Sequence, residues 1–159
     1  MTKAFLTILS VLMLQVMLSG QTVALTDKDG LVDILLAESD TTYVVNFWAT
    51  WCAPCIQEIG YFQELHNHYV NQKVKVILVS LDFPSQLKQR LTPFLDENNI
   101  TADVRLMTDL DYNSWINLVD PGWSGAIPAT LVFNNRKRTF VEKALSKNEL
   151  FDIVKQNHY

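Results

Sequence analysis

The chain holds only two cysteines, and they lie three positions apart. Cys52 and Cys55 enclose Ala53 and Pro54 in the segment Cys-Ala-Pro-Cys. A structural disulfide stabilises most when it closes a long loop, so a pair this close constrains little of the unfolded chain. The same pair suits thiol–disulfide exchange, in which one thiolate attacks a disulfide and a neighbouring thiol resolves the mixed disulfide. The spacing therefore indicates chemistry rather than a structural crosslink.

The residues around the pair are typical of a buried strand that leads into a helix. Residues 43–48 are β-branched and aromatic, as expected for a strand covered on both faces. Residues 53–71 carry apolar side chains at helical spacing, and Pro54 is tolerated in a first turn. The N-terminus of a helix lowers the pKa of a thiol placed there. We therefore predict that Cys52 is the nucleophile and that Cys55, one turn further on, is the more buried resolving thiol.

The rest of the chain predicts an α/β domain with a central mixed sheet flanked by helices, because helices and strands alternate before a C-terminal antiparallel hairpin and a last helix. Pro93 is expected to kink or split the helical segment around it. Ser146 and Glu149 form a capping box for the last helix. The predicted elements are a helix capped by Thr26 or Asp27 that ends near residue 39, strands over 74–81 and 104–107, helical segments over 85–98 and 112–119, a hairpin of strands 131–133 and 139–141, and a helix over 147–157.

The N-terminal residues have the composition of an export signal. A positive start at Lys3 precedes an apolar run over residues 4–18, and small and polar residues follow as far as Ala24. The apolar run is short for a helix that crosses about 30 Å of hydrocarbon. We predict a signal peptide over residues 1–20, with cleavage after Ala24 or an uncleaved membrane anchor as alternatives. Residues 21–159 then form one domain in the periplasm or an equivalent extracytoplasmic compartment.

Charge and residue inventory argue against several classes of protein. The net charge of −4 and the absence of a basic cluster argue against nucleic acid as a partner. A closed zinc site needs four ligands, and the sequence holds no second cysteine pair. His66 and His68 are two positions apart on a predicted helix and therefore point to different faces. Ile56 stands where covalent haem attachment requires His. We therefore expect no metal and no cofactor other than a redox-active Cys52–Cys55 disulfide.

The segment from Phe47 to Cys55 resembles the active-site segment of thioredoxin-like proteins, in particular of the extracytoplasmic TlpA/ResA branch. That branch has the same Cys-X-Pro-Cys centre, Asn in the preceding strand and Glu three residues after the second Cys, which here are Asn46 and Glu58. Residues 127–130, Ile-Pro-Ala-Thr, are similar to the cis-proline loop of the family. The resemblance implies a thioredoxin-like fold over about residues 25–157.

The resemblance also implies roles for the matching residues. Pro128, in cis, would lie beside the two sulfurs, and the backbone of Ile127 would pair with an extended substrate segment. Thioredoxins proper have a buried Asp where Asn46 stands, and Asn cannot accept a proton. Glu58 is therefore the candidate proton acceptor, provided that burial raises its pKa. A solvent-facing Glu58 is the alternative, and Gly60, where the branch usually has Pro, leaves the orientation of Glu58 open.

Two tryptophans are candidates for a substrate-binding surface. Trp51 precedes Cys52 and is predicted to cover the sulfur and contact the substrate, with core packing as the alternative. Trp123 lies between glycines in a loop just before Pro128. We expect Trp123 either to be exposed near the site, where it assists partner binding, or to plug the edge of the sheet.

These features together predict an exported, monomeric protein-disulfide reductase. Its partners would be protein disulfides or dithiols and a membrane electron donor. An oxidase or isomerase that runs the same exchange in the opposite direction is one alternative, because residues 53–54 do not determine the reduction potential. A non-catalytic thioredoxin-like adaptor is another. A peroxidase of the peroxiredoxin type would need a proline–threonine–cysteine arrangement that this sequence lacks.

Overall fold

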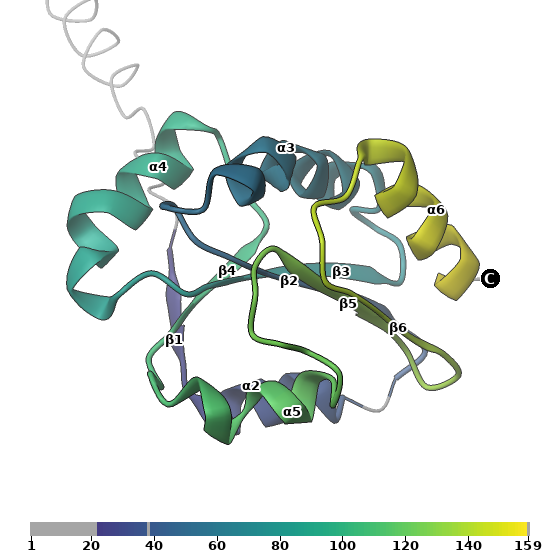
Figure 1. Cartoon of the computed structure of the whole chain (residues 1–159). Helices are drawn as coiled ribbons and strands as arrows, with labels where there is room; N and C mark the ends of the chain where they lie inside the picture. Colours follow the sequence, from purple (N-terminus) through teal and green to yellow (C-terminus); the bar gives the residue numbers. More distant parts are fainter. Residues whose placement is uncertain (1–21, 38, 159) are drawn as a thin grey trace, which may run out of the picture.

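The computed structural model describes residues 22–37 and 39–158 (Figure 1). The signal peptide predicted for residues 1–20 lies outside these residues. Within the described ranges, no helix combines the length and the apolar character that a membrane span requires.

A six-stranded mixed sheet forms the centre of the domain, with the strand order β1-β4-β3-β2-β5-β6. The first four of these strands are mutually parallel, whereas β5 runs antiparallel to β2 and β6 antiparallel to β5. This arrangement confirms the predicted mixed sheet with a C-terminal hairpin. The strands are β1 (Ala24–Thr26), β2 (Thr42–Trp48), β3 (Val74–Ser80), β4 (Asp103–Met107), β5 (Ala129–Phe133) and β6 (Arg138–Val141).

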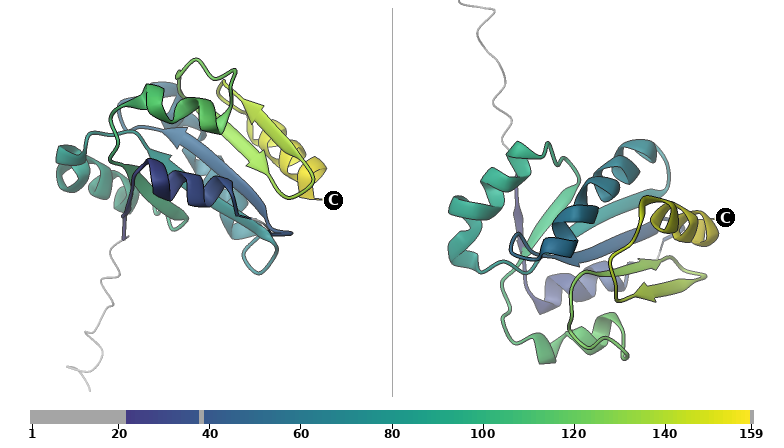
Figure 2. Two further views of the ribbon diagram at one scale, coloured as in Figure 1. Left: turned by 90° about the horizontal axis from the view of Figure 1, so that it is seen from below. Right: turned by 45° about the horizontal axis from the view of Figure 1, so that its top comes forward.

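Helices cover both faces of the sheet (Figures 1 and 2). One face carries α3 (Ala53–His68), α4 (Thr92–Glu97) and α6 (Lys147–His158), and the opposite face carries α2 (Lys28–Leu35) and α5 (Ile116–Val119). Three short helical turns complete the connections, namely η1 (Pro84–Gln86), η2 (Leu87–Leu91) and η3 (Tyr112–Ser114).

The central strands supply two separate apolar cores, because successive side chains of a strand point to opposite faces of the sheet. In β2, Val44 and Trp48 belong to the core beneath α3, whereas Val45 and Phe47 belong to the core above α2 and α5. Apart from Asn46, residues 43–48 of this strand are therefore apolar or aromatic on both faces, as the sequence predicted. The two cores hold β2 in place, and the end of β2 determines where the cysteine segment begins.

One strand and two helix ends differ from the sequence-based expectation. Strand β1 was not predicted, because three residues are too few to show a periodicity. The first helix is capped by Asp27, one of the two predicted caps, whose carboxylate accepts a hydrogen bond from the Gly30 N–H at 2.9 Å, but the helix ends at Leu35 rather than near residue 39. Helix α3 ends at His68 rather than residue 71, and Asn71 adopts a positive φ of 73°.

The predicted effects of Pro93 and of the capping box are confirmed. The helical segment is divided into η1, η2 and α4, and Pro93 lies in the first turn of α4, where its missing N–H leaves no helical bond unmade. The Ser146 N–H donates to Glu149 at 2.8 Å, and the Glu149 N–H donates to Ser146 Oγ at 3.3 Å. This box holds the start of α6 and with it the preceding residue, Leu145.

Candidate active site

The two cysteines lie where β2 has ended and α3 begins. Cys52 is the N-cap residue of α3, and Pro54 is exposed in the first turn. Cys52 and Cys55 are joined by a disulfide, with their Cα atoms 5.3 Å apart. Cys52 is 6% exposed and Cys55 is fully buried. The structure therefore has the predicted difference in burial, with the more accessible sulfur at the mouth of the helix.

The loop before β5 approaches Cys52 from the opposite side. The Ile127–Pro128 peptide bond is cis, and the Ile127 carbonyl oxygen lies 3.7 Å from Cys52 Sγ. The antiparallel register of β2 and β5 pairs Phe47 with Ala129 and so brings this loop to the cysteines. Pro128 has no N–H, so at this position the loop presents no backbone donor. Ile127 and Pro128, which the resemblance to the cis-proline loop pointed to, thus lie next to Cys52.

Glu58 is buried in α3, with 1% of its surface exposed. Asn46 Nδ2 donates to Glu58 Oε1 at 3.1 Å, and the Leu145 N–H donates to Oε2 at 2.6 Å. Burial raises the pKa of Glu58 to about 7, because removal from water penalises the charged form more than these two hydrogen bonds favour it. The alternative of a solvent-facing Glu58 is therefore wrong.

Asn46 is the partner that can accommodate either protonation state of Glu58. It is fully buried in β2, and its Nδ2 also donates to Thr130 Oγ1 at 3.1 Å. Among the residues that the structure describes, Asn46 Oδ1 has no hydrogen-bond partner. Reversal of the amide would present this oxygen to a protonated Glu58, since an amide offers a donor on one side and an acceptor on the other.

A cavity of about 190 Å³, lined by Glu58 and by the exposed residues Pro54 and Gln57, adjoins the carboxyl group.

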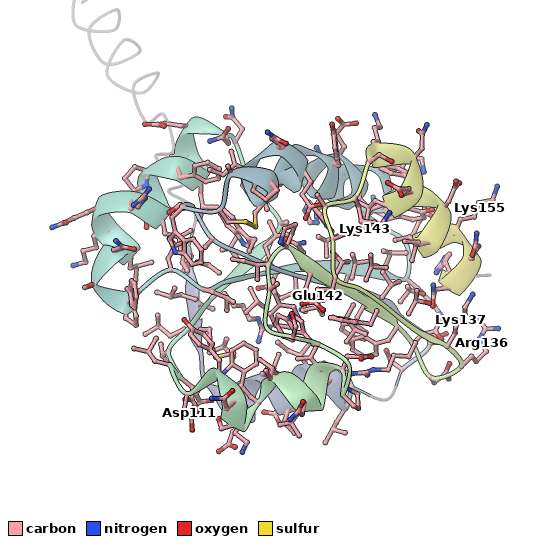
Figure 3. All side chains as sticks on the ribbon, viewed as in Figure 1. Asp111, Arg136, Lys137, Glu142, Lys143 and Lys155 are labelled. Carbon is pink, nitrogen blue, oxygen red and sulfur yellow. A yellow bond between two sulfur atoms is a disulfide. The ribbon has the colours of Figure 1, made fainter. Side chains whose placement is uncertain are left out.

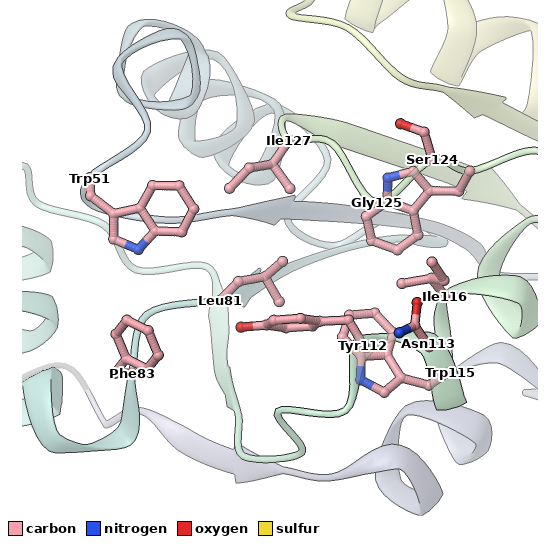
Figure 4. A pocket seen from close by; sticks show the side chains of 11 residues that line it. Trp51, Leu81, Phe83, Tyr112, Asn113, Trp115, Ile116, Ser124, Gly125 and Ile127 are labelled. Atoms are coloured by element: carbon pink, nitrogen blue, oxygen red, sulfur yellow. The ribbon is translucent and has the colours of Figure 1, made fainter.

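A second cavity, of about 390 Å³, is lined by Trp51 and Ile127 among others (Figure 4). Trp51 and Phe83 are 51% and 54% exposed, so the alternative of core packing for Trp51 is wrong. Within the described chain, none of the lining side chains carries a charge. Trp51 and Ile127 connect the cavity to Cys52. The lining residues of this apolar cavity are Trp51, Leu81, Phe83, Tyr112, Asn113, Trp115, Ile116, Trp123, Ser124, Gly125 and Ile127.

Trp123 lines the apolar cavity from within the core rather than from the surface. It is 3% exposed, its ring lies 4.7 Å from the Phe47 ring between centroids, and its Nε1–H donates to the Ala126 carbonyl at 2.8 Å. The expectation of an exposed Trp123 is therefore wrong, and the packing alternative holds. The neighbouring Gly125 has a φ of 91°, so this glycine serves a left-handed turn.

Asp82 is a buried acidic residue, bonded to the turn before Cys52, that the sequence did not single out. It follows β3 and is fully buried. Its carboxylate accepts hydrogen bonds from the Thr50 N–H at 3.0 Å, the Thr50 hydroxyl at 2.6 Å and the Ser80 hydroxyl at 2.8 Å. An Asp after a strand usually reads as a turn residue. One feature of the sequence did indicate that Asp82 lies near the cysteines. Asp82 stands at the end of a strand parallel to β2, and the ends of parallel strands meet at one edge of the sheet.

His68 packs against two aromatic rings, those of Tyr69 and Phe151, with centroid distances of 4.7 Å and 5.7 Å. In the described part of the chain, no three His, Cys, Asp or Glu side chains come together as a metal site would require.

The chain belongs to the AhpC/TSA family, whose model matches residues 18–139. It is 39% identical over 61 residues to the thiol-disulfide oxidoreductase ResA of Oceanobacillus iheyensis. That stretch covers 38% of this chain and 30% of the relative, so it represents only part of the relative's length. The sequence-based resemblance to thioredoxin-like proteins of the ResA type is confirmed.

Solved structures establish the thioredoxin-like fold. A thioredoxin family thiol:disulfide interchange protein from Chlorobium tepidum has a TM-score of 0.64 and 23% identity, over 76% of this chain and 81% of that one. A secreted thiol-disulfide isomerase from Corynebacterium glutamicum has a TM-score of 0.60 and 18% identity, over 78% of this chain and 72% of that one.

Proposed function

We propose that this chain is an exported thiol–disulfide oxidoreductase that reduces disulfides in proteins. The observation that carries the proposal is the Cys52–Cys55 disulfide at the N-terminus of α3, with the Ile127 carbonyl 3.7 Å from Cys52 Sγ. The names of its relatives, which are thiol-disulfide oxidoreductases and interchange proteins, support the same chemistry.

The exchange proceeds in two balanced steps. In the reduced protein the Cys52 thiolate, favoured by the N-terminus of α3, attacks one sulfur of the client disulfide. A mixed disulfide forms and the first client sulfur leaves as a thiolate. Cys55 then loses its proton and attacks Cys52 Sγ, the mixed disulfide breaks, and the second client sulfur leaves. The client gains two electrons, and the protein is left with the Cys52–Cys55 disulfide.

Glu58 takes the proton of Cys55 in the second step. Cys55 is fully buried, so its deprotonation needs an acceptor inside the protein. Glu58 lies one helical turn further along α3, and its pKa of about 7 is close to a working pH near neutrality. Asn46 stabilises Glu58 before the transfer as a hydrogen-bond donor and after it, with its amide reversed, as an acceptor.

The client polypeptide binds beside Cys52. An extended segment pairs with the backbone of Ile127 next to Pro128, and a neighbouring side chain enters the apolar cavity. Because no charged side chain lines that cavity in the described chain, a charged side chain would lose its water without gaining a partner. A bulky apolar side chain would instead cover the exposed rings of Trp51 and Phe83, while Trp123 forms the inner wall.

We propose that the cysteine pair reduces its client rather than oxidising it. A membrane protein would supply the electrons, and the working form would be a monomer. Export is supported by the composition of residues 1–24 and by a structural neighbour described as secreted. The oxidase and isomerase alternatives use the same cysteine pair and differ from the proposed reductase in the reduction potential of that pair. Equilibration with glutathione tests the direction, because a reductase pair would lie below the glutathione potential and an oxidase pair above it.

Trapping of the mixed disulfide tests the chemistry itself. The variant Cys55→Ala, incubated with a disulfide-containing peptide, is expected to accumulate a covalent adduct at Cys52, detected by mass and released by dithiothreitol. The double variant Cys52→Ala/Cys55→Ala is the matched control and should form none. A folded Cys55→Ala protein that binds the peptide without forming the adduct would support the non-catalytic adaptor instead.

A further inference from the structure

Asp82 is bonded to two segments that line the apolar cavity. Its chain neighbours Leu81 and Phe83 both line the cavity, and Figure 4 shows them below Trp51. Trp51 follows Thr50, whose N–H and hydroxyl both donate to the Asp82 carboxylate. The Asp82 carboxylate therefore links two parts of the cavity lining. One is the segment that carries Phe83, here called the Phe83 wall, and the other is the segment that carries Trp51, here called the Trp51 wall.

The surroundings of Asp82 favour a fixed carboxylate. It is fully buried, and among the residues that the structure describes it forms no salt bridge. A buried carboxylate without a cation depends on good hydrogen bonds. The Thr50 and Ser80 hydroxyls and the Thr50 N–H supply them, and the Asp82 N–H donates back to Ser80 Oγ at 3.1 Å. The two bonds from Thr50 restrict the position of its backbone relative to the end of β3, and the two bonds with Ser80 hold Asp82 itself.

The cysteine turn has hydrogen bonds of its own that do not involve Asp82. The Cys52 N–H donates to the Ala49 carbonyl at 3.1 Å, and the Cys52 carbonyl accepts from the Ile56 N–H at 3.1 Å. A change in the bonds between Asp82 and Thr50 should therefore alter the cavity walls more than the reactivity of the Cys52 sulfur.

We propose that Asp82 is a positioning residue that sets the separation of the Trp51 and Phe83 walls and thereby makes the protein selective for clients with a bulky apolar side chain next to their disulfide. The inference rests on the proposed function, since it concerns the client of the same site. Asp82 acts through Thr50 and touches neither the sulfurs nor the client.

The test compares Thr50→Val, which removes the hydroxyl donor at nearly constant volume, with Thr50→Ser, which retains it. Asp82→Asn is a third variant, and far-UV circular dichroism checks that each is folded. Reduced proteins react with two matched disulfide peptides, which carry Phe or Gly next to one cysteine, and with hydroxyethyl disulfide, which is too small to span the cavity. The readout is the ratio of the second-order rate constants for the Phe and Gly peptides.

The wild-type protein should favour the Phe peptide by about tenfold, and Thr50→Val and Asp82→Asn should reduce this preference by about fivefold. Thr50→Ser should retain it, and the rate with hydroxyethyl disulfide should change by less than about twofold in all variants. The inference is overturned if Thr50→Val keeps the wild-type preference, if all three rate constants fall together, or if the wild-type protein shows no preference. A wild-type protein inert towards all three disulfides would instead refute the proposed function, and this inference with it.

Discussion

Two buried carboxylates belong to segments next to the Cys52–Cys55 disulfide, but in different surroundings. In α3, Glu58 is bonded to one reversible side-chain amide and one backbone N–H, and burial raises its pKa to about 7. At the end of β3, Asp82 accepts from two hydroxyls and a backbone N–H. A carboxylate with a sparse, reversible set of partners suits proton transfer, whereas one with several fixed donors suits the positioning of a loop.

The cavity beside Glu58 and the apolar cavity also differ, in size and in lining. The one beside Glu58 is the smaller, and exposed Pro54 and Gln57 line it together with the carboxyl group, so protons can reach it from the surface. The apolar cavity is lined mostly by aromatic and aliphatic side chains. Proton transfer and client binding are thus assigned to two separate cavities. The predictions below test this division.

The largest expected effect concerns the two sulfurs. With single-cysteine variants, Cys52 in Cys55→Ser should react with iodoacetamide at pH 7 about a hundredfold faster than Cys55 in Cys52→Ser, because Cys52 is at the helix N-terminus and nearer the surface. Alkylation followed by mass spectrometry measures both rates. Equal rates would remove the distinction between nucleophile and resolving thiol.

Substitution of Glu58 should slow the second step of the exchange. In the wild-type protein, the rate at which the mixed disulfide resolves should rise as the pH passes 7 and then level off, since only ionised Glu58 accepts a proton. Glu58→Gln should lower this rate by about tenfold to a hundredfold at pH 8 and abolish the inflection. Glu64→Gln, on the same helix but at the surface, is the control. An unchanged pH profile in Glu58→Gln would exclude the proton-acceptor role.

Glu58 should also make stability depend on pH. Its folded pKa of about 7 exceeds the ordinary Glu value of 4.5, so its stabilising contribution is complete below pH 4.5 and is lost as the pH rises through 7. Relative to Glu58→Gln, the oxidised wild-type protein should lose about 2 kcal/mol of unfolding free energy between pH 5 and pH 8. Urea unfolding at the two pH values measures the difference, and parallel curves for the two proteins would contradict the elevated pKa.

The smallest expected effect is on client binding. Phe83→Ala should slow exchange with the Phe-containing peptide about threefold to tenfold and leave exchange with hydroxyethyl disulfide unchanged, because only the peptide reaches the cavity wall. Phe83 is 54% exposed, so its removal should cost little stability. Leu110→Ala changes a similarly exposed apolar residue outside the cavity and serves as the control. Equal losses with both substrates would argue against a client site there.

The amino-acid sequence by itself determined the local features of this protein. The buried character of residues 43–48, the start of a helix at the cysteines, the effect of Pro93 and the Ser146–Glu149 box all follow from residues within a few positions of one another. Such features depend on the periodicity, capping and steric restrictions of the chain itself. For the same reason, the spacing of Cys52 and Cys55 was enough to indicate their chemistry.

Only the tertiary structure decided what surrounds the cysteines. Burial raises the pKa of Glu58, its carboxyl group accepts a hydrogen bond from Leu145, which is 87 residues away, and Asp82 meets Thr50 across 32 residues. Trp123 is buried because its ring packs on Phe47, although its flanking glycines suggested exposure. Contacts between distant segments leave no periodic trace in the sequence. Burial and hydrogen bonding therefore become known only once the sheet has brought those segments together.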